Sequence, residues 1–379
     1  MKKEKTPIKT PRRIKKTEKT VFVGLSGGVD SSVSAALLKQ KGYKVTGVFI
    51  KGWYPDFLPC EWREERRDAM RVCAKLDIPF LTFDAEKDYK KNVIDYMVSE
   101  YKKGRTPNPD IMCNKHIKFG SFLNFAKKEG ADFIATGHYA RKKEYRMKND
   151  ECRYELLEAQ DKNKDQSYFL WTLTQKELKH TLFPIGHMQK AEVRILAKKF
   201  KLPTALKKDS QGICFLGKVD LKDFLNHYIA TKSGAVLDME GNKIGTHQGV
   251  NFLTIGQRHG FVINNKINHS KPLYVVSKNI TKNTIVVSDN YKDKSNSQGS
   301  DTIILKKTNW INNKPNKDNV YFVRFRYRQS LIKARVVLKS KKYIVNLFEG
   351  FRDISEGQSV VVYDRKGVCA GGGIISVIL

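Results

Sequence analysis

A glycine-bearing loop near the N-terminus constrains the fold more than any other segment. The string Ser26-Gly27-Gly28-Val29-Asp30-Ser31-Ser32 follows the apolar run Val21-Phe22-Val23-Gly24-Leu25 and leads into an alanine- and leucine-rich segment. This order predicts a strand, a tight turn and a helix. Because Gly27 and Gly28 have no Cβ, backbone N–H groups can close around a phosphate there. Ser31 adds a hydroxyl at the helix N-terminus, where the helix dipole already favours an anion.

The same loop argues against kinase or motor chemistry. A Walker loop reads G-x-x-x-x-G-K-[ST] and uses its Lys to reach the β- and γ-phosphates. No Lys lies between Ser26 and Ser32. The string S-G-G-x-D-S instead resembles the PP-loop of the ATP pyrophosphatases, which adenylate a substrate and release pyrophosphate. The resemblance implies ATP as the cofactor.

The segments that follow predict an α/β fold with a doubly covered parallel sheet. Strands are expected at 44–50, 80–83 and 133–136, and helices at 61–76 and 86–103. Strands alternating with helices of this length form parallel sheets with helices on both faces. Ligands of such sheets lie beyond the carboxyl ends of the strands. The glycine loop, the residues after Ile50 and the Gly137-His138 pair should therefore surround one crevice.

The chain length and its changes in pattern predict several parts. A chain of 379 residues usually holds two or three domains. We expect a disordered basic tail (1–20), a PP-loop domain (21–215), a small mixed α+β domain (216–287) and a C-terminal β-barrel (288–379). The last two assignments follow from short strands separated by turns after residue 216.

The charge balance indicates a polyanionic partner. Lys and Arg number 71 against 39 acidic residues, a formal net charge of +32. A genome biased toward lysine is the alternative explanation. In the C-terminal part, Phe322 to Arg328 alternates basic with apolar residues, so Arg324, Arg326 and Arg328 are expected to face phosphate. The alternative there is a solvated basic strand.

The cysteines and the apolar runs indicate the compartment. The six cysteines are scattered without a CxxC pair, which argues against a disulfide scaffold or a zinc site. No apolar run is long enough to span a bilayer or to act as a secretory signal. The expected compartment is the reducing cytoplasm, where any disulfide would be transient and catalytic.

Two cysteine-bearing segments are candidates for the chemistry. In the segment 105–114 two prolines stiffen what we expect to be a rigid loop, in which Asp110 can act as general acid or base and Cys113 as a nucleophile. The alternative is a capping turn with a buried thiol. Cys214 follows a polar segment that contains a glycine, and it is the second candidate for a reactive thiol. The alternative interpretation of Cys214 is a buried cysteine in a strand. Together the two thiols suggest persulfide chemistry.

Here the motifs, taken in order, resemble those of the tRNA-specific 2-thiouridylases. The resemblance runs from about Val21 to the C-terminus. Its motifs, besides the PP-loop, are Asn108-Pro109-Asp110-Ile111-Met112-Cys113-Asn114, Ala135-Thr136-Gly137-His138-Tyr139-Ala140, Lys164-Asp165-Gln166-Ser167-Tyr168, Ser210-Gln211-Gly212-Ile213-Cys214-Phe215, Gly245-Thr246-His247-Gln248-Gly249, Thr254-Ile255-Gly256-Gln257-Arg258, Arg326-Tyr327-Arg328-Gln329 and Gly357-Gln358-Ser359-Val360-Val361.

The resemblance implies a reaction in two halves. ATP adenylates the C2 oxygen of the wobble uridine, position 34 of the tRNAs for Lys, Glu and Gln, and pyrophosphate leaves. A cysteine persulfide then delivers sulfur to C2, and AMP departs. Mg²⁺ is expected with ATP, although no acidic metal cluster stands out in the sequence. The implied partners are tRNA and a sulfur donor, either a relay protein or a cysteine desulfurase, and no membrane.

The resemblance also assigns residues. Cys214 would carry the persulfide, Cys113 would be the nucleophile that releases sulfide or closes a transient disulfide, and Asp110 would be the acid or base. The nucleotide would be bound by Gly24, Leu25, Ser26, Gly27, Gly28, Val29, Asp30, Ser31, Ile50 and Gly137. The target base would contact Asn108, Pro109 and Asp110, and the rest of the tRNA would contact His138, Lys164, Asp165, Gln166, Arg326, Tyr327 and Gln358.

Two other functions remain open at this point. One is a basic RNA-binding protein that keeps a nucleotide fold without sulfur transfer. The other is a different adenylating PP-loop enzyme, such as a 4-thiouridine or lysidine synthase. The presence of both cysteine motifs and of Asp110 disfavours the two alternatives.

Overall fold

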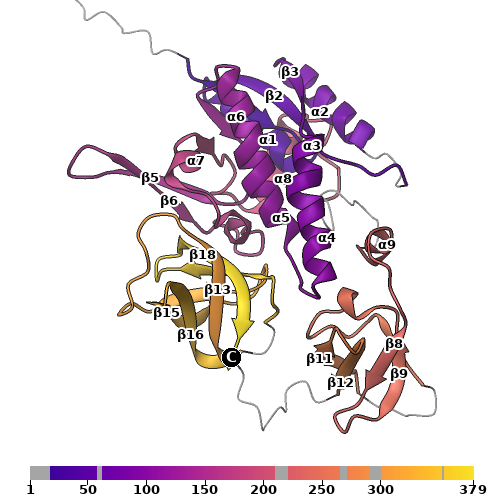
Figure 1. Ribbon diagram of the computed structural model, residues 1–379. Coiled ribbons are helices and arrows are strands. Elements are labelled where there is room, and N and C mark those ends of the chain that lie inside the picture. Colours follow the sequence, from indigo (N-terminus) through magenta and orange to yellow (C-terminus); the bar gives the residue numbers. More distant parts are fainter. Residues whose placement is uncertain (1–17, 58–61, 210–220, 265–270, 290–299, 352–353) are drawn as a thin grey trace, which may run out of the picture.

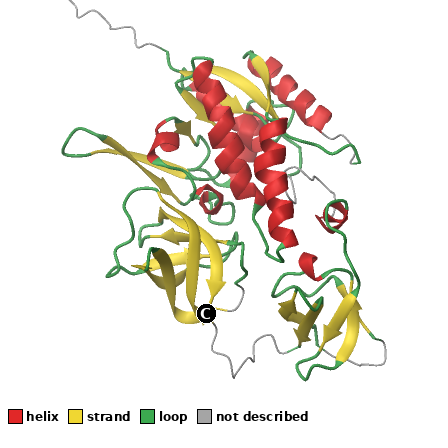
Figure 2. Cartoon of the chain, viewed as in Figure 1, coloured by secondary structure: helices red, strands yellow, loops and turns green. Residues whose placement is uncertain are grey.

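The computed structural model describes residues 18–57, 62–209, 221–264, 271–289, 300–351 and 354–379, and it shows three parts (Figure 1). Helices gather in the N-terminal part, and the other two parts are built mainly from strands (Figure 2). No helix among the described residues is long and apolar enough to cross a membrane.

The N-terminal part is built on the predicted parallel sheet. Its strands are β1 (Thr20–Gly24), β2 (Lys44–Lys51), β3 (Phe80–Asp84), β4 (Phe133–Ala135) and β7 (Thr181–Leu182), in the order β3-β2-β1-β4-β7. All four neighbouring pairs are parallel. From β1 the chain continues to one side through β2 and β3, and later to the other side through β4. The edge beyond the carboxyl ends of β1 and β4 is therefore the switch point where such sheets bind ligands.

Helices cover both faces of this sheet. Alternate residues of β1 face opposite ways: Val21 and Val23 pack in one core with Ala35, whereas Phe22 packs in another with Val93. This two-sided burial explains the continuous apolar run of the strand. The helical segments are α1 (Val29–Gln40), α2 (Trp62–Leu76), α3 (Glu86–Tyr89) continued by a π-helix (Lys90–Ile94) and α4 (Asp95–Lys102), α7 (Gln175–Lys179) and α8 (Lys190–Lys199).

The expected rigid loop around Asp110 is wrong, because a helix begins there. Pro109 occupies the first position of α5 (Pro109–Met112), which continues as a π-helix (Cys113–Ser121) and as α6 (Phe122–Lys128). Proline is tolerated at that position because the first N–H groups of a helix have no intrahelical partner. The Asn108 side chain caps the helix by accepting a hydrogen bond from the Ile111 N–H at 3.3 Å. Cys113 is therefore held on a helix rather than on a loop.

The central part holds a short helix and a small sheet of its own. Helix α9 (Leu221–Asn226) precedes the sheet, whose order is β10-β9-β8-β12-β11. Its strands are β8 (Gly234–Leu237), β9 (Lys243–His247), β10 (Phe261–Ile263), β11 (Tyr274–Asn279) and β12 (Thr284–Ser288).

The C-terminal strands close into a barrel, as predicted. The order is β13-β16-β15-β14-β17-β18, and a pairing between β18 and β13 completes the ring. The strands are β13 (Ser300–Trp310), β14 (Tyr321–Arg324), β15 (Ile332–Lys339), β16 (Lys342–Phe351), β17 (Ser359–Tyr363) and β18 (Val368–Ile378). Closure removes the exposed sheet edges.

A hairpin from the N-terminal part joins the barrel sheet. Strands β5 (Arg141–Arg146) and β6 (Cys152–Leu157) form the hairpin, and β6 pairs with β18 through Leu156 opposite Cys369. The polar, charged sequence of 141–153 is typical of a surface hairpin or loop, but it does not indicate the attachment to the barrel. The two parts thus share one sheet across about 200 residues of chain.

Arg324 joins the same two parts, and the expectation that it faces phosphate is wrong. It is only 7% exposed, and its guanidinium donates to Asp165 at 2.9 Å and to Glu158 at 3.0 Å. Strand β14 ends at Arg324, so the alternation of buried and exposed side chains that is expected to continue to Arg328 ends there. A buried cation needs carboxylate partners because it has lost its hydration. Arg324 is therefore an interdomain anchor.

We predict that Arg324→Met destabilises the protein by about 3–5 kcal/mol, because it leaves the buried Asp165 without a cation and Glu158 with Lys162 alone. Arg335→Met removes an exposed arginine of the barrel and should cost well under 1 kcal/mol. Urea denaturation of both variants measures the difference. Equal losses would show that the buried pair does not hold the domains together.

Candidate active site

One cavity of about 260 Å³ lies at the switch point of the parallel sheet. Its walls come from the ends of three neighbouring strands, from the start of α1 and from the helix that carries Cys113. Residues predicted from the sequence that line it are Gly24, Leu25, Ser26, Asp30, Ser31, Ile50, Cys113, Gly137, His138 and Gln166. The cavity therefore joins most of the predicted nucleotide residues to one of the predicted thiols.

The predicted glycine loop leads into α1 and contributes Ser26, Asp30 and Ser31 to the lining of the cavity. Gly27 has φ +69°, and a Cβ there would lie 2.5 Å from the Glu65 carbonyl oxygen, so only glycine fits. Gly28 is the N-cap of α1, and Val29 is its first residue. The Ser31 hydroxyl accepts a hydrogen bond from the Ser26 N–H at 3.3 Å, which holds the turn. This arrangement suits an anion because uncapped N–H groups meet the positive end of the helix dipole.

Gly137 lets the backbone after β4 approach this loop. A Cβ on Gly137 would lie 2.6 Å from the Ser31 nitrogen and 2.8 Å from the Asp30 carbonyl carbon. Both neighbours are backbone atoms, which cannot turn aside as a side chain would. Gly137 is therefore needed for the close packing that shapes the cavity.

Asp30 is held by groups that the sequence motifs do not reveal. Its carboxylate accepts a hydrogen bond from the Tyr139 hydroxyl at 2.9 Å and two from Lys190 Nζ at 2.7 and 2.9 Å. Burial and the Asp30 charge together raise the pKa of Tyr139, so its hydroxyl remains a donor. Lys190 begins α8, 160 residues away along the chain. These bonds fix the carboxylate at the rim of the phosphate loop.

Lys190 also connects the phosphate loop to Asp209. Its Nζ lies 2.9 Å from an Asp209 oxygen, and Lys164 and Arg194 lie 2.7 and 2.6 Å from the same carboxylate. Burial alone would raise the pKa of Asp209, but hydrogen bonds from Lys164 and Lys190 outweigh it and hold the pKa at about 2. Asp209 is the last residue described before the segment that contains Cys214. The predicted site residue Lys164 thus has a partner within the protein.

His138 lies in the cavity wall as a neutral ring. Its Nδ1 is 2.8 Å from the Thr136 hydroxyl, and its ring packs near Phe119 and Phe183. Burial, with a smaller effect from Lys118, lowers the pKa of His138 well below its ordinary value. A neutral imidazole offers one donor and one acceptor. His138 is predicted to contact tRNA, but in the structure it lines the cavity beside Gly137, among the predicted nucleotide-binding residues.

The predicted reaction-centre residues are only partly brought together. Cys113 is 4% exposed and lines the cavity one helical turn before Ile117. Asp110 lies three residues earlier, so the two side chains project from neighbouring positions of the helical segment. Cys214 lies outside the described residues, as does its whole motif from Ser210 to Phe215.

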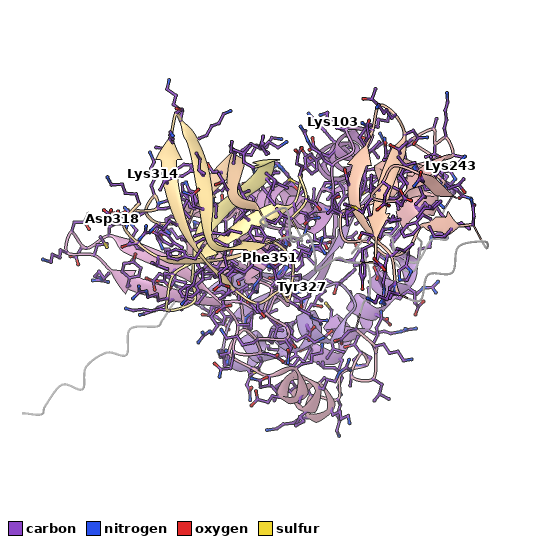
Figure 3. The ribbon with its side chains drawn as sticks, turned by 90° about the horizontal axis from the view of Figure 1, so that it is seen from below. Lys103, Lys243, Lys314, Asp318, Tyr327 and Phe351 are labelled. Atoms are coloured by element: carbon purple, nitrogen blue, oxygen red, sulfur yellow. The ribbon has the colours of Figure 1, made fainter. Side chains whose placement is uncertain are left out.

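Asn108 and three predicted tRNA residues converge around Tyr168. The buried Tyr168 hydroxyl lies near the Asn108 side chain and donates to the carbonyl oxygens of Phe325 at 2.7 Å and Ser359 at 3.3 Å. These carbonyls belong to the residues next to Arg326 and Gln358. Tyr327 packs on Phe169 with ring centroids 5.0 Å apart. Figure 3 shows Tyr327 near the middle of the molecule, between the two β-rich parts.

Of the predicted tRNA residues Gln166 and Asp165, the first faces the cavity and the second is buried with its partners inside the protein. Gln166 lines the cavity and accepts the Tyr139 N–H at 2.9 Å. Asp165 is 1% exposed, and its oxygens are occupied by Arg324, by Ser167 and by the Ala159 N–H. Its role in this structure is to join the domains, and a direct tRNA contact would need the side chain to leave these partners.

Sequence reasoning missed several residues of the site. Lys118, Thr136 and Glu65 line the cavity, and Tyr139 and Lys190 hold Asp30. Tyr139 directly follows the Gly137-His138 pair, so its motif was a usable signal. Lys190 and Glu65 lie on helices whose packing only the fold reveals.

Comparison with known proteins supports one family. The description "tRNA methyl transferase HUP domain" matches residues 19–218, "tRNA methyl transferase PRC-barrel domain" matches 222–289, and "Aminomethyltransferase beta-barrel domain" matches 300–375. The chain is 44% identical over 365 residues to the tRNA-specific 2-thiouridylase MnmA of Oceanobacillus iheyensis, covering 95% of each chain. The enzyme of the same name from Halalkalibacterium halodurans is 43% identical over 371 residues, covering 96% of this chain and 97% of the relative.

The chain belongs to the tRNA-specific 2-thiouridylase family.

Among solved structures, a 4-thiouridine synthetase in complex with RNA and bound ATP overlaps 55% of this chain and 50% of its own, with 19% identity and a TM-score of 0.35. The family assignment of this thiouridylase therefore rests on the two relatives that match it over nearly its full length.

We predict that Gly137→Ala lowers ATP affinity at least about tenfold, because the new methyl forces the backbone of the phosphate loop to move. Gly130→Ala places the same methyl at φ +82° with nothing within 4 Å, so only the conformational cost of about 1–2 kcal/mol applies. Isothermal titration calorimetry with ATP measures the affinities of the two variants and of the wild type. Wild-type affinity in Gly137→Ala would contradict the close approach.

We predict that Asp209 stabilises the fold at neutral pH and loses this effect in acid. Because its pKa falls from an ordinary 3.8 to about 2 on folding, its contribution is full above about pH 4 and disappears as the pH drops toward 2. Urea denaturation of Asp209→Asn should show a stability deficit at pH 6 that narrows to zero near pH 2. A deficit that does not change with pH would contradict the ion-pair assignment.

Proposed function

We propose that this protein thiolates C2 of uridine 34, the wobble position, in tRNA, using ATP to activate the oxygen that sulfur replaces. The observation that carries the proposal is the cavity in which the phosphate loop, Ile50 and Gly137 meet Cys113. Nucleotide binding and thiol chemistry thus share one space. The near full-length relatives named for this activity support the same conclusion.

The phosphate loop supports the first half of the reaction. The C2 oxygen of uridine attacks the α-phosphorus of ATP, and pyrophosphate is the leaving group. The N–H groups at the start of α1 can bind the negative charge that develops on pyrophosphate. Ile50, at the end of β2, would meet the adenine ring through its backbone. Adenylation is required because the C2 oxygen is a poor leaving group until it becomes part of AMP.

Mg²⁺ is expected to accompany ATP. It is usually bound by one or two carboxylates together with substrate phosphates, and Asp30 and Glu65 are carboxylate residues that line the cavity. Within the described residues no group of three or more metal-binding side chains is present. Glu65 offers a carboxylate of the kind that binds Mg·ATP, and Asp30 would share its oxygens between the ion, Lys190 and Tyr139. The ion would supply charge neutralisation on the phosphates.

The two cysteines supply the second half. In our proposal the terminal sulfur of a Cys214 persulfide attacks C2, the C2–O bond to AMP breaks, and AMP departs. The Cys113 thiolate then attacks the Cys214 sulfur, which releases the thiolated base and forms a Cys113–Cys214 disulfide. Alternatively, Cys113 attacks the persulfide first and hydrosulfide attacks C2. Both routes consume an external thiol that reduces the disulfide, as a reducing cytoplasm provides.

The tRNA surface is proposed to run from the cavity to the barrel. Asn108 lies near the buried Tyr168 hydroxyl, which bonds the carbonyl oxygens of the residues next to Arg326 and Gln358, so the predicted base contacts adjoin the predicted contacts from the barrel. The base must leave its stack to reach the cavity. The tRNAs for Lys, Glu and Gln remain the proposed substrates, and a sulfur relay protein or a cysteine desulfurase the proposed donor.

The matching descriptions also name methyl transfer, which is the less favoured function. The loop Ser26 to Ser32 has the S-G-G-x-D-S string of enzymes that cleave ATP to AMP and pyrophosphate. Methyl transfer needs neither a phosphate loop nor the Cys113 thiol in the cavity wall. The curated relatives carry the thiouridylase name over nearly their whole length.

Mass spectrometry of nucleosides from tRNA incubated with the protein, ATP and a sulfur donor tests the proposal. We expect 2-thiouridine among the nucleosides, in an oligonucleotide that contains position 34 when the tRNA is cut by a ribonuclease instead, and one AMP and one pyrophosphate per sulfur. Methylated uridine would indicate methyl transfer, and 4-thiouridine would indicate another adenylating enzyme. Binding of tRNA without any modified nucleoside would favour the RNA-binding alternative.

Cysteine variants separate the two half-reactions. Cys113→Ser and Cys214→Ser should lose more than about 99% of 2-thiouridine formation but keep a single turnover of ATP-dependent pyrophosphate release. Cys152→Ser is the matched control, because Cys152 is exposed on β6. Thiolation at the wild-type rate by Cys214→Ser would refute the persulfide assignment.

A further inference from the structure

A second cavity lies on the seam between the helical part and the barrel. Its volume is about 310 Å³. The helical wall comes from the π-helix and α4 on one side and from the segment after Cys113 on the other, and the barrel wall comes from β13 and β18. The residues that line it include Lys91, Lys115, His116, Trp171, Thr172 and Lys307. No residue of this lining is acidic, and none is shared with the nucleotide cavity.

The charged residues that line this cavity are all basic, and the acidic neighbour Asp88, which is not in the lining, only partly offsets their effect on His116. Burial lowers the pKa of Lys115, and the positive charge of Lys307 lowers it further. Burial also lowers the pKa of His116, with additional effects from Lys115 and Lys307. Such mutual repulsion costs stability unless an anion occupies the space between the cations.

The backbone of β13 is distorted where it meets the cavity. Lys307 has φ +50°, in the left-handed region that a non-glycine residue rarely adopts. The ladder between β13 and β18 shifts its register between Lys306 and Asn309, which marks a bulge. Bulges re-aim a side chain and often lie beside functional sites. Asn309 anchors the bulge by donating to the carbonyl oxygens of Trp171 at 2.8 Å and Leu173 at 2.9 Å.

Two buried polar groups of the cavity wall have no hydrogen-bond partner among the described residues. They are the Trp171 Nε1 and the Thr172 Oγ1, on side chains that are 1% and 7% exposed. An unpaired buried donor costs about 1–3 kcal/mol, so such groups usually mark a missing ligand or water. Both are able to donate a hydrogen bond to an anion.

We propose that this cavity binds a phosphate group. A phosphate would be met by Lys91, Lys115 and Lys307 and by the Thr172 hydroxyl and the Trp171 indole N–H. Its source is either a backbone phosphate of the tRNA or inorganic phosphate from solution. The tRNA source rests on the proposed function, whereas the inorganic source does not.

The test compares the double variant Lys115→Gln/Lys307→Gln with the control Lys333→Gln/Lys342→Gln, which removes two exposed charges elsewhere on the barrel. Thermal unfolding is followed in phosphate and in chloride at equal ionic strength, with ATP saturating the first cavity. The control should keep the phosphate-specific rise in Tm, and the double variant should lose most of it. Thr172→Val, which leaves the charge unchanged, should also reduce that rise without lowering the Tm in chloride.

A second measurement identifies the source. If the tRNA backbone supplies the phosphate, the double variant weakens tRNA binding about tenfold relative to the control and lowers the slope of log affinity against log salt by about one. If tRNA binding matches the control while the phosphate effect is lost, the ligand is the free anion. The proposal is overturned if the double variant matches the control in both measurements. Neither readout requires thiolation, so a wrong reaction assignment would not affect the result.

Discussion

The ion pairs of Arg324 hold the geometry on which the other features depend. One guanidinium from the barrel reaches Asp165 and Glu158 of the helical part, and all three side chains are less than 9% exposed. Burying these charges costs desolvation energy that a hydrophobic contact would avoid. The ion pairs therefore contribute mainly by specifying how the two parts are oriented. Because the two terminal nitrogens of the planar guanidinium each donate to a different carboxylate, the pairs favour one orientation of the two parts. Asp165 is followed by Gln166, which lines the nucleotide cavity, and Arg324 is two residues before Arg326. The same pairs therefore set the distance from the cavity to the barrel surface.

The phosphate loop and the parallel sheet were predictable because their signals are local. Val21 to Ser32 contains the strand, the turn and the helix start in one stretch, and the apolar run of β1 reflects burial on both faces. The convergence of Gly24, Ile50 and Gly137 follows from the rule that parallel strands end at one edge. The sequence predicts Cys113 as a nucleophile, but only the structure places it in the wall of the same cavity.

The rest depended on tertiary contacts that a pattern does not contain. The prolines before Asp110 predict a loop, but Pro109 takes the one helical position where its missing N–H has no cost. Arg324 alternates with apolar residues as a surface strand would, but its carboxylate partners lie more than 150 residues earlier. Lys190 and the unpaired groups of the second cavity have no motif at all. For Cys214 the evidence remains that of the sequence.

The hairpin β5–β6 has a consequence for how the chain is made. Its strands are synthesised long before β18, yet β6 pairs with β18 at Val368 and Cys369. Until the last residues leave the ribosome, one edge of the hairpin has no neighbour, and an open strand edge can pair with other chains. A product truncated before residue 368 would contain the whole phosphate loop and Cys113 but keep this edge exposed. Such a truncated chain would therefore be prone to pair β6 with other chains, through a strand that lies in its first half.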